Sequence, residues 1–200
     1  MNRLLLLLLS SSATLLVFGL WIPVKAVVAQ EMLALAWAES QARRTETRPW
    51  PWADTWPVAR MALPGLDRSM IVLEGTHGES LAFGPGRVAG TGSDNGPVII
   101  AGHRDTHFRK LNELKAGSEI RLQGQDGQWQ NYRVESFRIV DSRREQIDTQ
   151  RLSRDVLLLV TCYPFEALEA GGPLRYVVMA RRQDPAPVNR VEQIDTVAGL

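Results

Sequence analysis

Residues 118–141 read SEIRLQGQDGQWQNYRVESFRIVD, and they indicate the fold class more clearly than any other part of the chain. Apolar and polar residues alternate on both sides of QDG, which is the pattern of two half-buried strands joined by a tight turn. We therefore expect a β-hairpin here. A similar pattern of short strands and turns recurs from residue 61 onward, as short apolar runs separated by Gly, Asp or Asn. These runs are SMIVLEG (69–75), ESLAFGPG (79–86), GPVIIAGH (96–103), DVLLLVTC (155–162) and LRYVVMARR (174–182).

Many short strands with regular turn signals predict an all-β fold, either a sandwich or a closed barrel. A parallel α/β sheet is disfavoured because the crossover helices that it needs are missing. Within this body only FRKLNELKAG (108–117) reads as a helix, with Gly117 as its stop. The last stretch, residues 183–200, has two prolines and little periodicity, so we expect a mobile tail.

The composition of the whole chain fits one globular domain with appendages. The chain has 200 residues, of which 44% are hydrophobic and 22% are charged. Its formal net charge is +1, which gives no electrostatic reason to expect a nucleic-acid partner.

The N-terminus, residues 1–25, carries a long apolar segment. The stretch Leu4–Val24 is long enough to cross a hydrocarbon core of about 30 Å as a helix, and Pro23 is expected to end it. One interpretation is a cleaved signal peptide, with residues 27–29 (VVA) as a poor cleavage site. A retained anchor is favoured, because the apolar span exceeds the usual signal-peptide core of about 7–15 residues. In either case we expect the rest of the protein outside the cytoplasm, with the retained anchor making a single pass through the inner membrane.

Residues 26–60 are expected to connect this segment to a barrel domain at 61–182. Their first part, 26–44, has the composition of a helix. RPWPWADTWPVARM (48–61) follows, where the prolines impose an extended backbone. We expect its tryptophans to staple the arm onto the domain, because an indole buries a large area. The alternative is a membrane-interface belt or a strap beside a functional site.

Cys162 is the only cysteine of the chain and ends the apolar run LLLVTC. A single unpaired thiol in an exported protein suggests a reactive residue, although a lone buried cysteine is also often inert packing. A nucleophilic cysteine needs a proton partner and a nearby positive charge. His103 ends the similar run GPVIIAGH and Arg175 opens the next strand, so all three residues lie at strand termini and are expected at one rim of the sheet.

These stretches resemble a known family. AGHRDTHF (101–108), LLLVTCYPF (157–165) and GGPLRYVV (171–178) are similar to the corresponding segments of the sortases, cysteine transpeptidases of the bacterial cell surface. The segments PWPWADTWP and LAFGPG add a resemblance to the Gram-negative subgroup called the marine proteobacterial type. Leu159 replaces the first Thr of the Thr-x-Thr-Cys pattern of the family, and Thr161 keeps the second.

The resemblance implies an eight-stranded β-barrel that cleaves a Leu-Pro-x-Thr-Gly-like sorting signal and transfers the acyl group to an amine. Cys162 would then be the nucleophile, His103 the proton donor and acceptor, and Arg175 the group that holds the oxyanion or the substrate backbone. Thr161 would orient the substrate or supply a backbone donor. The implied partners are a secreted or membrane-bound protein with a C-terminal sorting signal, an apolar segment and a basic tail, together with an amine-bearing acceptor and the membrane. No cofactor is expected, because acyl transfer through a thioester needs none.

Asp105 is a candidate for orienting the imidazole of His103, and capping of the FRKLNEL segment is an equally good role for it. The spacing of HRDTH also matches a histidine metal pair, but the glutamate of HExxH and a third ligand are missing, so no metal is expected.

Four other kinds of cysteine enzyme and one non-enzyme are alternatives to this interpretation. Caspases carry Gln-Ala-Cys-x-Gly in an α/β fold, and papain-like enzymes place Cys before His. The Thr76-His77-Gly78 element is similar to that of L,D-transpeptidases but has no cysteine behind it, so we interpret it as a turn. A cysteine endopeptidase that uses water as acceptor, or a membrane-tethered binding module without catalysis, stays open.

Overall fold

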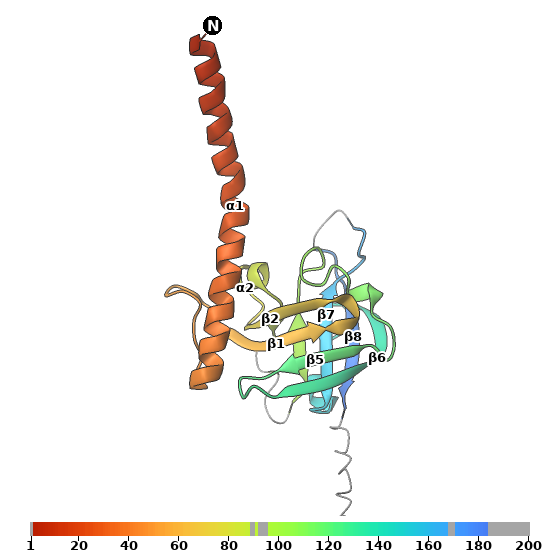
Figure 1. Ribbon diagram of the computed structural model, residues 1–200. Coiled ribbons are helices and arrows are strands. Elements are labelled where there is room, and N and C mark those ends of the chain that lie inside the picture. The colour runs from red at the N-terminus through yellow and green to blue at the C-terminus, as the bar shows by residue number, and fades with distance from the viewer. Residues whose placement is uncertain (1, 89–90, 92–95, 168–170, 184–200) are drawn as a thin grey trace, which may run out of the picture.

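The computed structural model describes residues 2–88, 91, 96–167 and 171–183. Within them a closed barrel lies beside the lower half of a long N-terminal helix (Figure 1). The strands are β1 (Pro57–Leu63), β2 (Arg68–Glu74), β3 (Gly86–Arg87), β4 (Val98–Ala101), β5 (Glu119–Gln123), β6 (Trp129–Asp141), β7 (Val156–Cys162) and β8 (Leu174–Arg182). The helices are α1 (Asn2–Arg43) and α2 (Gly78–Phe83), with 3-10 helices η1 (Pro64–Leu66), η2 (Leu111–Glu113) and η3 (Thr149–Arg151).

The barrel follows the strand order β1-β2-β3-β4-β7-β8-β6-β5 and closes where β5 pairs with β1. The pairs β2–β3 and β4–β7 are parallel, and the remaining pairs are antiparallel. The expected fold, an eight-stranded closed barrel with few helices behind an N-terminal helix, is confirmed. The QDG hairpin is also confirmed, as the β5–β6 pair.

Strand β7 is central to the packing because both of its faces are covered. Leu157 and Leu159 belong to the main core inside the barrel, and both are fully buried. Leu158, between them, joins a smaller cluster on the outer face with Val140 and Val177. Burial of one such leucine contributes about 1.5–3 kcal/mol relative to exposure. A continuous apolar run, rather than an alternating one, is what a strand buried on both faces requires.

Helix α1 continues without a break through Pro23, so the expectation that this proline ends the apolar helix is wrong. Proline removes one helical hydrogen bond, and its ring meets the carbonyl four residues earlier, here that of Gly19. Prolines are nevertheless tolerated in apolar helices of the length that spans a membrane. The half of α1 after Pro23 is held by packing against β1, β2 and α2, which keeps the helix intact.

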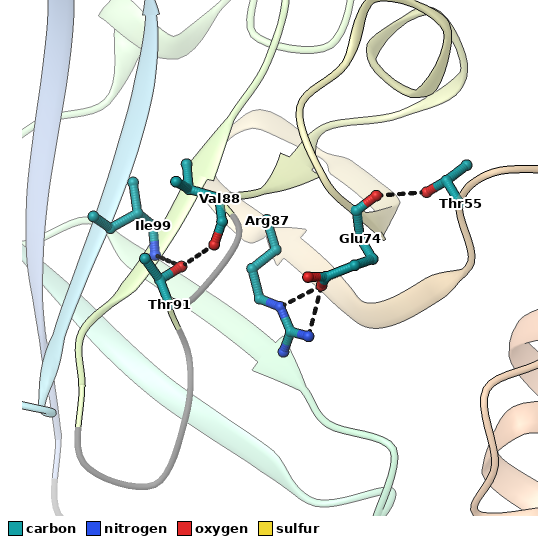
Figure 2. A network of polar contacts seen from close by, with 6 residues as sticks. All are labelled: Thr55, Glu74, Arg87, Val88, Thr91 and Ile99. Carbon is teal, nitrogen blue, oxygen red and sulfur yellow. Dashed lines mark hydrogen bonds and ion pairs between the residues drawn. The ribbon is translucent and has the colours of Figure 1, made fainter.

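The arm after α1 returns to the barrel through turns and bends. Trp50 packs edge-on against Phe83 of α2, with ring centroids 5.0 Å apart, and Trp56 packs against the main core. The hydroxyl of Thr55 donates a hydrogen bond of 2.7 Å to the carbonyl of Glu74 in β2 (Figure 2). Two of the three tryptophans of the arm thus fasten it to the domain, as expected.

A set of polar contacts, shown in Figure 2, connects β2 to β3 and the chain after β3 to β4. The guanidinium of Arg87 places Nε and Nη2 at 2.7 and 2.6 Å from Oε2 of Glu74. The hydroxyl of Thr91 donates to the carbonyl of Val88 at 2.7 Å and accepts from the amide of Ile99 at 3.3 Å. These contacts fix the start of β4, the strand that leads to the candidate site.

Residues 108–117 do not form the expected α-helix. They fold into turns and the single 3-10 turn η2, because Phe108 and Leu111 are both drawn into the barrel core, where each is 1% exposed. The chain then reverses at Gly117, whose φ of +87° favours glycine, and enters β5. Gly117 therefore ends the segment as expected, although the segment is not helical.

The segment ESLAFGPG (79–86) was expected to be a strand, and this is wrong for most of it. Its first part belongs to α2, and only Gly86 enters a strand, the two-residue β3. The buried hydroxyl of Ser80 donates to the carbonyl of His77 at 2.9 Å, which closes the first turn of the helix. Packing of α2 against α1 overrides the strand-like pattern of the sequence.

Strand β1 begins at Pro57, inside the segment that the sequence assigns to the connecting arm. Of the expected mobile tail, residues 184–200 lie outside the described part of the chain.

Candidate active site

Cys162 and Arg175 face each other across neighbouring strands. In the antiparallel β7–β8 pair, Cys162 is directly opposite Arg175, and Val160 is opposite Val177. Residues directly opposite in an antiparallel pair point to the same face of the sheet. Because Val177 belongs to the outer cluster, Cys162 and Arg175 both point to the outer face of the barrel. The thiol is partly exposed there.

His103 reaches the same face from the other side of β7. Strand β4 pairs in parallel with β7, with Ala101 opposite Val160, and the amide of Gly102 donates to the carbonyl of Val160 at 3.0 Å. Continuing this register by two residues beyond the end of β4 places the backbone of His103 beside that of Cys162. Ile99 of β4 lies in the outer cluster, and the side chain of His103 is exposed. The register therefore places the backbones of His103, Cys162 and Arg175 next to one another at one rim of the barrel.

Thr161 lies on the opposite face from Cys162. Its side chain is 2% exposed, and its hydroxyl donates a hydrogen bond of 2.7 Å to the carbonyl of Gly102. This bond ties the residue before His103 to the residue before Cys162. The structure thus gives the side chain of Thr161 a place inside the barrel, where it holds the two strand ends together.

The guanidinium of Arg175 is oriented by the backbone of its own loop. Its Nη1 donates to the carbonyls of Gly172 and Leu174, the latter at 2.9 Å. Within the described residues, Nε and Nη2 make no hydrogen bond. A guanidinium has five N–H donors in a fixed fork, so these atoms are suited to an oxygen of a bound substrate.

Arg104 is the residue of this site that sequence reasoning missed. Its side chain is only 6% exposed, and its Nη1 donates to the carbonyl of Pro164 at 2.7 Å. The arginine therefore links the loop after His103 to the loop after Cys162. The only signal in the sequence is the position of Arg104 directly after His103. Neighbouring residues of an extended chain point to opposite faces, so an exposed His103 implies an inward-facing Arg104, and a buried charge needs partners.

Asp105 supplies the other partner of Arg104. Its two carboxylate oxygens lie 2.7 and 3.1 Å from Nε and Nη2 of that arginine. This hydrogen bonding lowers the pKa of Asp105 and raises the pKa of Arg104. No hydrogen bond joins Asp105 to His103 among the described residues, and the helix that it was to cap is not formed. Its role as an orienter of the imidazole stays a prediction.

The loop after Cys162 is packed by aromatic rings. Tyr176 of β8 lies in a stacked arrangement with Tyr163 at 6.4 Å between ring centroids, and Phe165 meets the edge of Tyr176 at 5.2 Å. Burial raises the pKa of Tyr176, so the phenol is neutral around neutral pH. These contacts fix the chain that leaves Cys162.

The second histidine of HRDTH, His107, is turned toward the protein. Its Nε2 is buried without a hydrogen-bond partner, and desolvation by burial lowers the pKa of the imidazole. In the part of the chain that the structure describes, no group of three or more His, Cys, Asp or Glu side chains is arranged to hold a metal ion.

The sequence matches the family model of the sortase domain over residues 61–183, which is more than half of the chain. The chain belongs to the sortase family. It is 32% identical to Sortase D of Bacillus subtilis (strain 168) over 124 residues, which cover 61% of this chain and 62% of that protein. The chain thus spans less than two thirds of the length of that relative.

Solved sortase structures share the fold. Sortase A from Corynebacterium diphtheriae superposes with a TM-score of 0.58 at 25% identity, covering 69% of this chain and 66% of that chain. A Sortase D5 transpeptidase from Clostridium perfringens gives a TM-score of 0.57 at 20% identity, covering 78% and 96%. Helix α1 is long and apolar enough, by length and composition, to cross a membrane.

Proposed function

We propose that this sortase cleaves a Leu-Pro-x-Thr-Gly-like sorting signal through a thioester on Cys162 and transfers the acyl group to an amine. The observation that carries the proposal is the register of β4, β7 and β8, which supports a shared outer rim for His103, Cys162 and Arg175. A nucleophile, a proton carrier and a fixed cation at one place are what acyl transfer requires.

In the first half-reaction the sulfur of Cys162 attacks the carbonyl carbon of the signal threonine. The C–N bond to glycine then breaks, and His103 donates a proton to the departing amine. Nε and Nη2 of Arg175 stabilise the oxyanion that forms on the carbonyl oxygen. In the second half-reaction His103 takes a proton from the incoming amine, which attacks the thioester and releases the sulfur. Asp105 is assigned imidazole orientation. Thr161 is assigned a supporting role in which its backbone, and not its buried side chain, would contact the substrate.

We further propose that the protein is a single-pass protein of the inner membrane, with residues 1–25 as anchor, 26–60 as connecting arm and 61–182 as catalytic domain outside the cytoplasm. PWPWADTWP and LAFGPG support assignment to the marine proteobacterial type. Transfer to water in place of the amine, which would make the protein an endopeptidase, is the second candidate, because Cys162 is partly exposed and His103 is exposed to solvent.

The full chain in detergent micelles, incubated with a sorting-signal peptide and a glycine-based amine, tests these assignments. Chromatography separates the ligated from the hydrolysed product and so distinguishes the transpeptidase from the endopeptidase. Cys162→Ala and His103→Ala should each abolish both products. His77→Ala, which changes a histidine outside the site, is the matched control and should react normally. Full activity of the Cys162→Ala variant would overturn the role of Cys162, and the absence of both products with the native chain would favour the binding module without catalysis.

A further inference from the structure

Helix α1 runs without interruption from the apolar segment at its N-terminus to the half that packs against the barrel. The helix is long and apolar enough to cross a membrane. Its stretch Leu4–Val24 is exposed throughout, and at 1.5 Å per residue it measures about 31 Å, which matches a hydrocarbon core of about 30 Å. Lys25 lies over the ring of Trp21, 5.5 Å from its centroid. Tryptophan and lysine at this position are typical of the membrane–water interface.

The second half of α1 is fixed to the barrel domain. One stripe of the helix is buried, with successive members three or four residues apart or adjacent, as one helical face requires. It contacts β1, β2 and α2, and Gln30 Nε2 donates to the carbonyl of Phe83 at 2.8 Å. The stripe consists of Ala29, Leu33, Ala36, Trp37 and Ser40.

The distance between the two halves is short. Ala29, the first buried residue of the stripe, follows Val24 by about 7.5 Å along the helix axis. A continuous helix over this distance is stiff, and the arm tied by Thr55 to Glu74 fastens the domain a second time (Figure 2). The barrel is therefore held at one height and in one orientation relative to the apolar segment.

The orientation matters because only one end of the barrel faces the apolar half of α1. In Figure 1 the chain loops that follow β4 and β7 lie at the end of the barrel from which the N-terminal half of α1 rises. The C-terminal end of β8 lies at the opposite end. Cys162 is the last residue of β7, and Arg175 lies near the beginning of β8. The candidate active site is thus at the end nearest to the apolar segment.

We propose that α1 is a rigid strut that presents the Cys162 end of the barrel to the bilayer surface. A site held there would meet the substrate that the family resemblance implies, a protein with an apolar segment behind its sorting signal, with the scissile bond just outside the headgroups. The inference rests on the proposed function. It adds that the distance between membrane and site is set by the helix, and that the bilayer surface forms one side of the substrate channel.

The first test measures position without activity. Cys162 is the native single cysteine, so the full chain in vesicles accepts one fluorescent label there. Energy transfer to acceptor-labelled lipid headgroups should be strong from this position. The comparison is a Gln183→Cys, Cys162→Ala variant, with the label beyond the far end of β8. This position is eight residues from Arg175, the partner of Cys162, or about 27 Å along the strand. Equal transfer from both positions, or stronger transfer from residue 183, would overturn the proposed orientation.

The second test uses a seven-residue alanine-rich insertion between Lys25 and Ala26, which adds two helical turns and lifts the barrel by about 10.5 Å with little rotation. The same insertion between Asn2 and Arg3 is the control, because it leaves the junction unchanged. Vesicles carry a sorting signal followed by an apolar span, and a soluble signal peptide is assayed in parallel.

We expect the junction insertion to slow processing of the membrane-held substrate by about 100-fold, as misplacement of reacting groups does. Cleavage of the soluble peptide should not change. Equal processing of the membrane-held substrate by both insertion variants would contradict the strut. Failure of every variant, including the native chain, to cleave the soluble peptide would count against the proposed function and not against the geometry.

Discussion

Cys162 and Arg175 occupy directly opposed positions of the β7–β8 ladder, so the ladder fixes the separation of their two Cα atoms. A cation held beside a nucleophile in this way is preorganised for the charge that forms during acyl transfer, and it needs no reorganisation when the charge appears. The ladder sets the spacing of the two backbones, and the hydrogen bonds of Nη1 to the carbonyls of Gly172 and Leu174 orient the guanidinium.

Replacement of Arg175 should therefore reduce turnover more than binding. Arg175→Ala removes the donors aimed at the oxyanion, and we expect kcat to fall by about 10²–10³-fold. Arg182→Ala, at the other end of the same strand and exposed, should leave kcat unchanged. Steady-state kinetics with a sorting-signal peptide provide the measurement. A rise in KM alone would assign Arg175 to uniform substrate binding instead.

Replacement of Arg104 is predicted to reduce catalytic activity more than replacement of Asp105. Arg104→Met removes the hydrogen bond that links the loop after His103 to Pro164, so the imidazole and the thiol lose their mutual placement. We expect activity to fall by about 10²-fold, because small displacements of reacting groups have effects of this size. Asp105→Asn keeps an oxygen acceptor for Arg104 and should cost much less. The reverse order of the two variants would support Asp105 as the orienter of His103.

Thr161 is predicted to act through the Gly102 carbonyl. Thr161→Val keeps the shape of the side chain but leaves that buried carbonyl without its 2.7 Å hydrogen bond, which costs about 1–3 kcal/mol of stability. Thr161→Ser retains the hydroxyl and should be nearly neutral in thermal unfolding. Should Thr161→Val lose activity with no change of stability, a direct role at the substrate would be favoured.

Burial of His107 makes the stability of the fold depend on pH, and the direction of this dependence follows from the lowered pKa of the imidazole. Desolvation lowers the pKa of His107 in the folded state below the ordinary value of 6.5, so the unfolded chain binds the proton more readily. Stability is fully present above about pH 6.5, and it decreases as the pH falls below that value until the folded-state pKa is reached. His107→Gln should flatten this part of the profile in thermal unfolding scans between pH 5 and 8. An unchanged slope would show that other groups cause it.

The sequence predicts the barrel, and the positions of His103, Cys162 and Arg175 at strand ends, better than it predicts the segments between strands. The runs ending in His103 and Cys162 are apolar on both faces, and such strands have few alternative positions in a fold. The FRKLNEL and ESLAFG segments were misassigned because tertiary packing decides short segments: Phe108 is drawn into the core, and α2 packs against α1. The structural role of Arg104 could not be predicted, because its hydrogen-bond partner, the carbonyl of Pro164, lies sixty residues away in the sequence.

The most direct test of the account is intact-mass spectrometry of the full chain in detergent after rapid acid quenching with a sorting-signal peptide. We predict a mass increase equal to the acyl part of the peptide, mapped by proteolysis to Cys162, which disappears when an amine is added. Cleavage of the peptide with the acyl group on another residue, or with no covalent adduct even in the absence of amine under single-turnover conditions, would contradict the assignment of Cys162 as the nucleophile.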